Sequence, residues 1–163
     1  MKEPYRTLIE KLIEALKRKY GERFISLIIY GSVARGEAKR SSDIDLLLII
    51  DSLPKIKLER QKEFIDTENE LTEYLDELSE DGCLIDLSPI IKTPKEASRV
   101  SPLYLDMVED AIIAYDKDDF FKNILEKVRN RLKELGSKRV SMGKRWYWIF
   151  KPDYHFGELI RIG

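Results

Sequence analysis

The sequence predicts an α/β (α+β) domain in which helices flank a small mixed β-sheet, with a helix and a hairpin at the C-terminal end. Runs of β-like residues alternate with segments whose apolar residues recur at helical spacing. The strands are too few, and the long helices too many, for a β-sandwich or a barrel. A length of 163 residues allows one well-buried core. We therefore expect a single domain, with a core over residues 1–115 and a C-terminal segment over 116–163 packed on it.

Apolar spacing and turn residues place the elements of the first half. A helix is predicted over residues 4–20, and the run RFISLIIY gives a strand over 24–30. Gly31 ends this strand, and Ser32 is expected to be the N-cap of a short helical turn. The segment DIDLLLII, residues 43–50, is the second strand. Its unbroken apolar run predicts burial on both faces and a central place in the sheet.

The same signals place the elements of the second half. A long helix over 56–79 is followed by a turn at Asp81-Gly82 and by a third strand, CLIDLSPII, over 83–91. The remaining expected elements are a helix from Ser101-Pro102 to about Ile113, a short strand AIIAYD, a helix over 121–135 that ends at Gly136, and a terminal hairpin.

The composition excludes several classes of protein. With 43% hydrophobic and 36% charged residues, the chain is typical of a soluble globular protein and not of a disordered or membrane protein. No apolar run approaches the roughly 18 residues that span a bilayer. The N-terminus lacks the apolar region of a signal peptide, and the single Cys83 cannot form an internal disulfide. We therefore expect a cytoplasmic protein that makes no membrane contact.

The charges are distributed unevenly along the chain. Ten acids and two bases lie between Glu59 and Asp81, whereas ten bases and two acids lie between Phe120 and Lys151. Two interpretations stay open: solvated helix faces, or complementary surfaces for a partner or for a second copy of the chain in a homo-oligomer. The net charge of −1 gives no overall reason to expect a nucleic acid.

Two aspartates stand at the start of the second strand. Asp43 and Asp45 are two residues apart, so both carboxylates project from the same face of the strand while Ile44 points the other way. Two neighbouring carboxylates repel each other unless a proton or a cation lies between them. Mg²⁺ is usually held by one or two carboxylates together with substrate phosphates. The pair therefore indicates a metal site.

The Gly31-Ser32 turn supplies a second half for such a site. A glycine lets backbone amides approach a phosphate, and the start of a helical turn directs N–H groups and the Ser32 hydroxyl at an anion. Phosphate at the turn and Mg²⁺ at the carboxylates would together hold a nucleoside triphosphate such as ATP.

Asp86 is the third candidate acid. It falls within an otherwise apolar predicted strand, where an unpaired charge would be costly. On a strand beside Asp43 and Asp45 it could ligate a metal and activate an acceptor hydroxyl, as in sites where two metal ions clamp the attacking and leaving oxygens. Asp81 is a rival, but its place before Gly82 favours a turn.

The stretch GSVARGEAKRSSDIDLLL resembles the signature of the DNA polymerase β superfamily of nucleotidyltransferases, and its spacing is similar to that of the minimal nucleotidyltransferases. The resemblance implies a polymerase-β-like nucleotidyltransferase fold. It also implies that Gly31 and Ser32 hold the triphosphate, that Asp43 and Asp45 bind Mg²⁺, and that a third carboxylate, Asp86, completes the site. The motif covers residues 31–45, and the order of elements extends the likeness to about Ile91.

The resemblance implies an Mg²⁺-dependent enzyme, with two ions, that transfers AMP from ATP to a hydroxyl group. Superfamily members that act on nucleic acids carry large additional domains, for which this chain has no room, so nucleic acid is not the expected partner. The acceptor is then a protein, by resemblance a HEPN-domain toxin, or a small molecule. The alternative is a nucleotide-binding antitoxin or regulatory module that acts by complex formation without turnover.

The C-terminal tail is both basic and aromatic. Five bases and no acid lie between Lys138 and Lys151, and Trp146 and Trp148 share one face of the predicted hairpin. Lys144 and Arg145 are among these bases. Two interpretations stay open: a hairpin that packs on the core, or a surface that docks an acceptor or partner.

Overall fold

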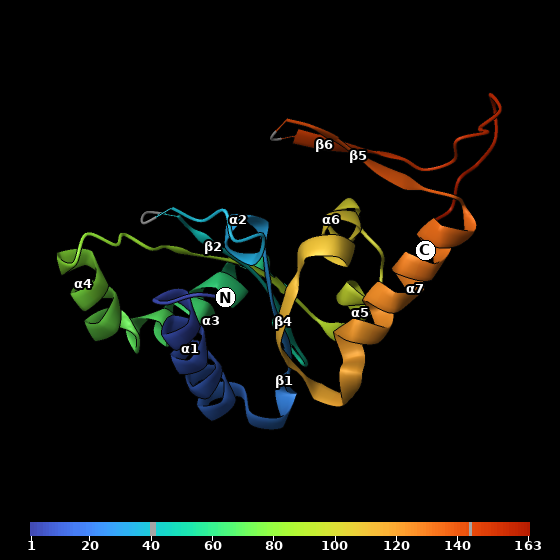
Figure 1. Ribbon diagram of the computed structural model, residues 1–163. Helices are drawn as coiled ribbons and strands as arrows, with labels where there is room; N and C mark the ends of the chain where they lie inside the picture. Colours follow the sequence, from blue (N-terminus) through green and yellow to red (C-terminus); the bar gives the residue numbers. More distant parts are fainter. Residues whose placement is uncertain (40–41, 144) are drawn as a thin grey trace.

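Four strands form a mixed β-sheet through the centre of the molecule (Figure 1). The computed structural model describes residues 1–39, 42–143 and 145–163. The strands are β1 (Phe24–Tyr30), β2 (Ile44–Ile50), β3 (Leu87–Lys92) and β4 (Ile112–Asp116), in the order β3-β2-β1-β4. β2 pairs parallel to β3 and antiparallel to β1, and β1 pairs antiparallel to β4. The predicted fold class and the central place of the second strand are both confirmed.

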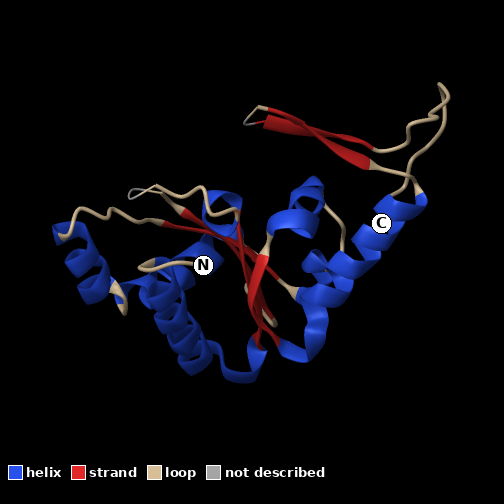
Figure 2. Cartoon of the chain, viewed as in Figure 1, coloured by secondary structure: helices blue, strands red, loops and turns tan. Residues whose placement is uncertain are grey.

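Helices lie on both sides of this sheet (Figure 2). They are α1 (Tyr5–Tyr20), α2 (Gly31–Ala34), α3 (Lys57–Asn69), α4 (Thr72–Glu80), α5 (Pro94–Ala97), α6 (Pro102–Asp110) and α7 (Phe120–Glu134), with 3₁₀ turns at Gly21–Arg23 and Lys117–Asp119. In Figure 1, α1, α3 and α4 lie to one side of the sheet and α5, α6 and α7 to the other. Among the helices of the described residues, none is both long and apolar enough to span a membrane.

A separate two-stranded hairpin follows α7. Its strands are β5 (Lys138–Met142) and β6 (Arg145–Ile149), which pair with each other and with no strand of the main sheet. The hairpin extends from the end of α7 across the top of α6 (Figure 1). The predicted C-terminal helix and hairpin are thus present, whereas the division at residue 115 stays a prediction.

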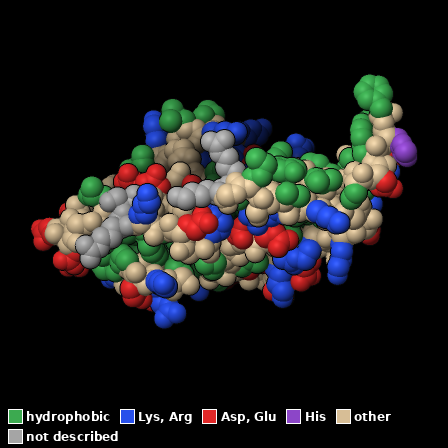
Figure 3. Space-filling view, turned by 45° about the horizontal axis from the view of Figure 1, so that its top comes forward, with side chains coloured by type: hydrophobic (Ala, Val, Ile, Leu, Met, Phe, Trp, Pro, Cys, Tyr) green, Lys and Arg blue, Asp and Glu red, His purple; other side chains and the backbone are tan. Residues whose placement is uncertain are grey.

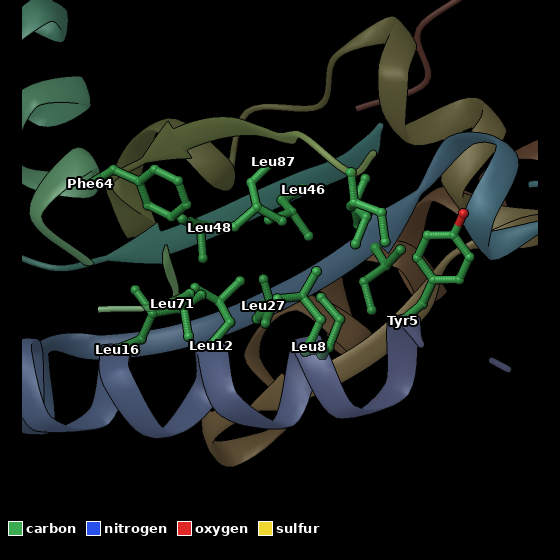
Figure 4. Close-up of a cluster of buried hydrophobic side chains, with 14 of the residues drawn as sticks. Tyr5, Leu8, Leu12, Leu16, Leu27, Leu46, Leu48, Phe64, Leu71 and Leu87 are labelled. Atoms are coloured by element: carbon green, nitrogen blue, oxygen red, sulfur yellow. The ribbon is translucent and has the colours of Figure 1, made fainter. Parts of the chain in front are cut away.

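The first of two core clusters lies between α1 and the sheet (Figure 4). Leu8, Leu12 and Leu16 recur at three- to four-residue spacing on α1 and are 0% exposed. They face Leu46 and Leu48 of β2, which are equally buried. Burial of a leucine side chain contributes roughly 1.5–3 kcal/mol to folding, so this layer is a main source of stability.

The second cluster lies on the opposite face of the same strands. Leu47 and Ile49 of β2 pack there with residues of α6 and α7, among them Tyr104 and Phe121, whose rings meet edge to face with centroids 5.1 Å apart. Trp148 of the hairpin packs against the margin of this cluster. The C-terminal segment therefore contributes to the second core and not to the first.

The predicted helix over 56–79 is wrong, because two helices occupy this stretch. α3 ends at Asn69, and the amide of Leu71 donates to the carbonyl of Glu68 at 2.8 Å, a tight turn that interrupts the helical pattern. Leu71 is only 4% exposed and packs into the first core cluster. Tertiary packing therefore sets the break, which no glycine or proline marks in the sequence.

Two further boundaries differ from the prediction. The helix from Pro102 ends at Asp110 and not near Ile113, because residues 112–116 are needed for β4, the edge partner of β1. The third strand begins at Leu87 and not at Cys83, so Asp86 precedes the strand. The short strand AIIAYD and the helix over 121–135 are confirmed within one residue at most boundaries.

β3 is an edge strand whose outer side contacts α3. The amide of Ile44 donates to the carbonyl of Asp86 at 2.9 Å, so the backbone groups of even-numbered residues face β2 and those of Pro89 and Ile91 face away. Gln61 of α3 donates to the Pro89 carbonyl at 3.2 Å. Arg60, 4% exposed, donates to the Ile91 carbonyl at 3.4 Å.

Candidate active site

The two aspartates of the motif lie at the start of β2. Ile44 is fully buried in the first core cluster, and alternation along the strand turns its neighbour Asp45 to the other face. Asp43 is exposed, and Asp45 is half-buried. The expectation that both carboxylates share a face stays a prediction, because Asp43 directly precedes β2.

Burial and repulsion both act on Asp45. Burial raises the pKa of its carboxyl group, the nearby charge of Asp43 raises it further, and the guanidinium of Arg35 lowers it. The charged form of the pair is thus under strain in the protein alone, and a cation between the carboxylates would relieve it.

Gly31 and Asp45 are in direct contact. A Cβ atom built on Gly31 would meet the Asp45 carboxylate, with the Cγ atom only 3.0 Å away. Gly31 also has a φ of +71°, a left-handed conformation that favours glycine. The structure therefore brings the glycine-serine turn and the aspartate pair into one site, and both the space and the backbone angle call for glycine.

Tyr30 is the cross-strand neighbour of Asp45. The sequence analysis did not single out this tyrosine. Burial, together with the charge of Asp45, raises the pKa of its hydroxyl to about 12. The phenol therefore stays protonated and available as a hydrogen-bond donor at neutral pH. The sequence did contain a signal for this pairing. If the first two strands pair antiparallel, the end of the first strand, Tyr30, lies opposite the start of the second, Asp45.

The predicted N-cap at Ser32 is wrong. α2 begins at Gly31, Tyr30 precedes it as the capping position, and no side chain caps the helix. The left-handed φ of Gly31 starts the turn one residue earlier than expected. Ser32 is therefore the second residue of the turn, half-buried, where the first amides of a helix have no partner within the helix.

Asp86 lies beside the aspartate pair in the backbone but is not grouped with it. Its carbonyl accepts the Ile44 amide, yet its side chain is exposed, so the buried environment expected for it is wrong. Its charge acts on Glu68 of α3, whose pKa is raised by burial and then by Asp86. The rival Asp81 follows the end of α4 as an exposed capping residue, as a turn role requires.

The carboxylates of Asp43 and Asp45 would bind a hard divalent cation only together with a substrate that supplies further ligands. Within residues 1–39, 42–143 and 145–163, no group of three Asp, Glu, His or Cys side chains is arranged to hold a metal ion. Asp43 and Asp45 fit Mg²⁺ as a two-carboxylate set whose remaining ligands are phosphate oxygens and water. The third-carboxylate role of Asp86 stays a prediction.

Arg35 directly follows α2, and its backbone amide donates to the Gly31 carbonyl at 3.2 Å. Its side chain is 23% exposed, and its Nε donates to Glu37 Oε2 at 2.9 Å. Lys39 is exposed, and its backbone carbonyl accepts the Tyr5 hydroxyl at 2.7 Å. Arg40 lies outside the described residues.

The mixed sheet and this site together define an enzyme class. A turn suited to an anion contacts Asp45, one of two neighbouring carboxylates that suit a divalent cation, at one end of a buried strand. This combination serves the transfer of phosphorus-bearing groups between oxygens.

Comparison with known families makes the class specific. A family model described as "Nucleotidyltransferase domain" matches residues 9–134. The chain belongs to this nucleotidyltransferase family and is an enzyme of that activity. The hairpin β5–β6 lies beyond the matched residues.

Relatives of known name extend the comparison. The chain is 32% identical over 141 residues to a protein of Methanocaldococcus jannaschii with the provisional name protein adenylyltransferase MJ1305, over 85% of this chain and 90% of that protein. It is 37% identical to the protein adenylyltransferase MntA of Thermococcus cleftensis, over 48% of this chain and 71% of that one. A crystal structure described as a toxin-antitoxin with AMP-PNP is 19% identical, with a TM-score of 0.45, over 78% of this chain and 91% of that chain.

Proposed function

We propose that this nucleotidyltransferase uses Mg²⁺ and transfers AMP from ATP to a hydroxyl group of a protein. The contact between Gly31 and Asp45 carries the proposal, because it joins the triphosphate turn to the carboxylates that would hold the metal. The names of the two relatives, both protein adenylyltransferases, support AMP as the transferred group and a protein as the acceptor. A HEPN-domain protein is the acceptor expected from the family resemblance.

Each candidate residue has a separate role in the proposed reaction. Gly31 and Ser32 would hold the triphosphate, and Asp43 and Asp45 would hold Mg²⁺, which supplies charge neutralisation at the α-phosphate. The acceptor oxygen attacks the α-phosphorus, the bond from that phosphorus to the bridging oxygen breaks, and pyrophosphate leaves. Asp86 would accept the proton of the hydroxyl group.

ATP labelled at one phosphate tests the reaction. The protein is incubated with Mg²⁺, a lysate of its own source, and ATP labelled at either the α- or the γ-phosphate. We expect an acceptor protein to carry the α-label only. Transfer of the γ-label would mean phosphoryl transfer and would overturn the proposal. Label on a small molecule would reject the protein acceptor.

Two matched variants test the proposed base. Asp86→Asn should reduce turnover more than nucleotide binding, and Asp81→Asn should change neither, because Asp81 lies at the end of α4. Loss of turnover with Asp81→Asn and full turnover with Asp86→Asn would mean that the third acid is misplaced.

The alternative is binding without turnover, in an antitoxin or regulatory role. It predicts Mg²⁺-dependent ATP binding without transfer of either label to any acceptor, including a purified HEPN partner. The cytoplasmic location and a homo-oligomer stay predictions. Fractionation of cells of the source organism would measure the location, and sedimentation of the purified chain would measure the oligomeric state.

A further inference from the structure

The inner face of the C-terminal hairpin is anchored to α6. Trp148 pairs with Arg139 and Trp146 with Ser141 across the two strands, so these four side chains share a face. The Trp146 indole Nε1 donates to Asp106 Oδ1 at 2.7 Å, and Arg139 forms an ion pair with Asp110 at 2.7 Å. The hairpin is thus held in place by polar contacts from two consecutive turns of α6.

The outer face of the same hairpin differs in character. Met142, Tyr147 and Ile149 are exposed there, and hydrophobic side chains gather over the hairpin in Figure 3. Of the five bases expected to dock a partner, Arg139 pairs with Asp110, and Lys151 pairs with Glu158 at 2.7 Å. Both bases are thus paired within the chain, and the ion pair of Arg139 with Asp110 favours a structural role for the inner face.

The guanidinium groups of two arginines lie over the ring of Trp146. The Cζ atom of Arg139 lies 4.3 Å from the ring centroid, and that of Arg35 lies 4.8 Å from it. Arg35 comes from the loop directly after α2, more than a hundred residues earlier in the chain. The ring therefore links the end of the chain to the loop of the Gly-Ser motif.

Arg35 also lies next to the Gly-Ser turn. Its backbone amide donates to the Gly31 carbonyl at 3.2 Å, and Gly31 in turn contacts the Asp45 carboxylate. A cavity of about 360 Å³ opens between this loop and the hairpin, lined by Arg35, Glu37, Asp110, Arg139, Ser141 and Trp146 among others. The Arg35 guanidinium thus lies over the Trp146 ring, its Nε donates to Glu37 Oε2 at 2.9 Å, and its side chain lines the cavity.

We propose that Trp146 is a positioning residue of the nucleotide site, which holds the Arg35 guanidinium in place to bind the triphosphate. A guanidinium presents a rigid fork of donors that matches phosphate oxygens, and stacking on an aromatic ring fixes its plane. An arginine held in this way loses less side-chain freedom when the ligand binds. The hairpin is then a working part of the site, although it lies outside the matched family domain. The inference rests on the nucleotide site of the proposed function, but not on transfer.

Calorimetry on two variants gives the first test. We expect Trp146→Ala to weaken MgATP binding by about tenfold, the loss typical of a partly desolvated cation–π contact. AMP, which lacks the β- and γ-phosphates, should lose much less. Trp146→Phe keeps an aromatic face and loses the hydrogen bond to Asp106, so it should restore part of the ATP affinity. Once an acceptor is known, the Michaelis constant for ATP should rise while the turnover at saturating ATP stays near that of the parent.

Trp148→Phe is the matched control. It removes a tryptophan from the same face of β6, and the Trp148 Nε1 has no hydrogen-bond partner among the described residues. It should leave the ATP affinity unchanged. Because the chain has two tryptophans, this variant also makes Trp146 the only one, so its fluorescence should change when MgATP binds. In Trp146→Phe, the remaining Trp148 should give no such change.

If Trp146→Ala fails to fold, the other variants still test the role of Trp146. Arg35→Lys keeps the charge and loses the planar stacking, so it should weaken ATP more than AMP, as Trp146→Ala does. Unchanged ATP affinity in Trp146→Phe and Arg35→Lys, together with a silent Trp146 fluorescence in Trp148→Phe, would overturn the proposal. Equal losses for ATP and AMP would also overturn it and assign Trp146 to folding. ATP binding without any transfer would reject the proposed reaction but leave this test intact.

Discussion

The two faces of β2 differ in the side chains that they present. On the face toward α1, Ile44, Leu46, Leu48 and Ile50 are all fully buried and apolar. On the other face, Leu47 and Ile49 are buried under α6 and α7, while Asp43 and Asp45 occupy the start of the strand beneath the Gly-Ser turn. The two-residue period of a strand lets one segment provide stability on one side and the carboxylates of a candidate site on the other. Changes on the two faces should therefore have separable effects.

The largest expected effect on stability is on the α1 face. Leu46→Ala should lower the free energy of unfolding by about 2–5 kcal/mol, because it removes a fully buried side chain and leaves a cavity between α1 and the sheet. Urea unfolding measures the loss. The folded fraction should bind MgATP with unchanged affinity, and a change in that affinity would mean that the two faces are coupled.

The next effect tests the contact between the turn and the aspartate pair. Gly31→Ala should cost more than the roughly 1–2 kcal/mol of a left-handed alanine, because its Cβ would also meet the Asp45 carboxylate. Gly36→Ala is the matched control, since Gly36 has a φ of +73° and nothing within 4 Å of its Cβ position. Equal losses of unfolding free energy for the two variants would show that the contact with Asp45 carries no weight. Only Gly31→Ala should also impair MgATP binding.

On the aspartate face, charge removal should separate binding from stability. Asp45→Asn should weaken MgATP binding by about tenfold or more, since even groups that only support a metal ligand cost that much. The pKa of Asp45 is raised in the folded protein, so its charged form opposes folding above that pKa, and its removal should leave stability at neutral pH unchanged or higher. Asp51→Asn, at the exposed far end of β2, should alter neither property. A less stable Asp45→Asn variant would contradict the repulsion argument.

The smallest expected effect concerns pH and a pair outside the site. Hydrogen bonds from Arg60, and a backbone bond from Thr93, lower the pKa of Glu96 from 4.5 to about 2, against the opposing effect of burial. The stability that this pair supplies should be fully present above pH 4.5 and lost as the pH falls toward 2. Glu96→Gln should flatten the stability curve in that range. An identical pH dependence in the parent and the variant would contradict this assignment.

Local patterns were sufficient to predict much of the site. The alternation of Ile44 and Asp45 indicated that Asp45 lies on the face opposite the first core cluster, and the Gly-Ser pair marked the turn that contacts Asp45. The buried apolar run after Asp45 was enough to place β2 at the centre of the sheet. These features depend on neighbours within a few residues, which is the range that a sequence pattern reports.

The errors lie where distant contacts decide. The break before Leu71 depends on the core that Leu71 enters, and the exposure of Asp86 depends on where β3 starts to pair with β2. The stacking of Arg35 on Trp146 joins segments more than a hundred residues apart, and no periodicity in either segment indicates it. Only the three-dimensional arrangement of α2, α6 and the hairpin shows that Arg35 is held and not solvated.

The outer side of β3 bears on whether a strand of another molecule can extend this sheet. An edge strand with free N–H and C=O groups invites a strand of another molecule to pair with it, the first step toward aggregation. Along this edge, Pro89 has no N–H to donate, Gln61 occupies its carbonyl, and Arg60 occupies that of Ile91. A proline on the solvent side of an edge strand is well tolerated because no ladder bond is lost there. The outer side of β3 therefore offers fewer free backbone groups for intermolecular sheet extension, while β2 is paired on both sides.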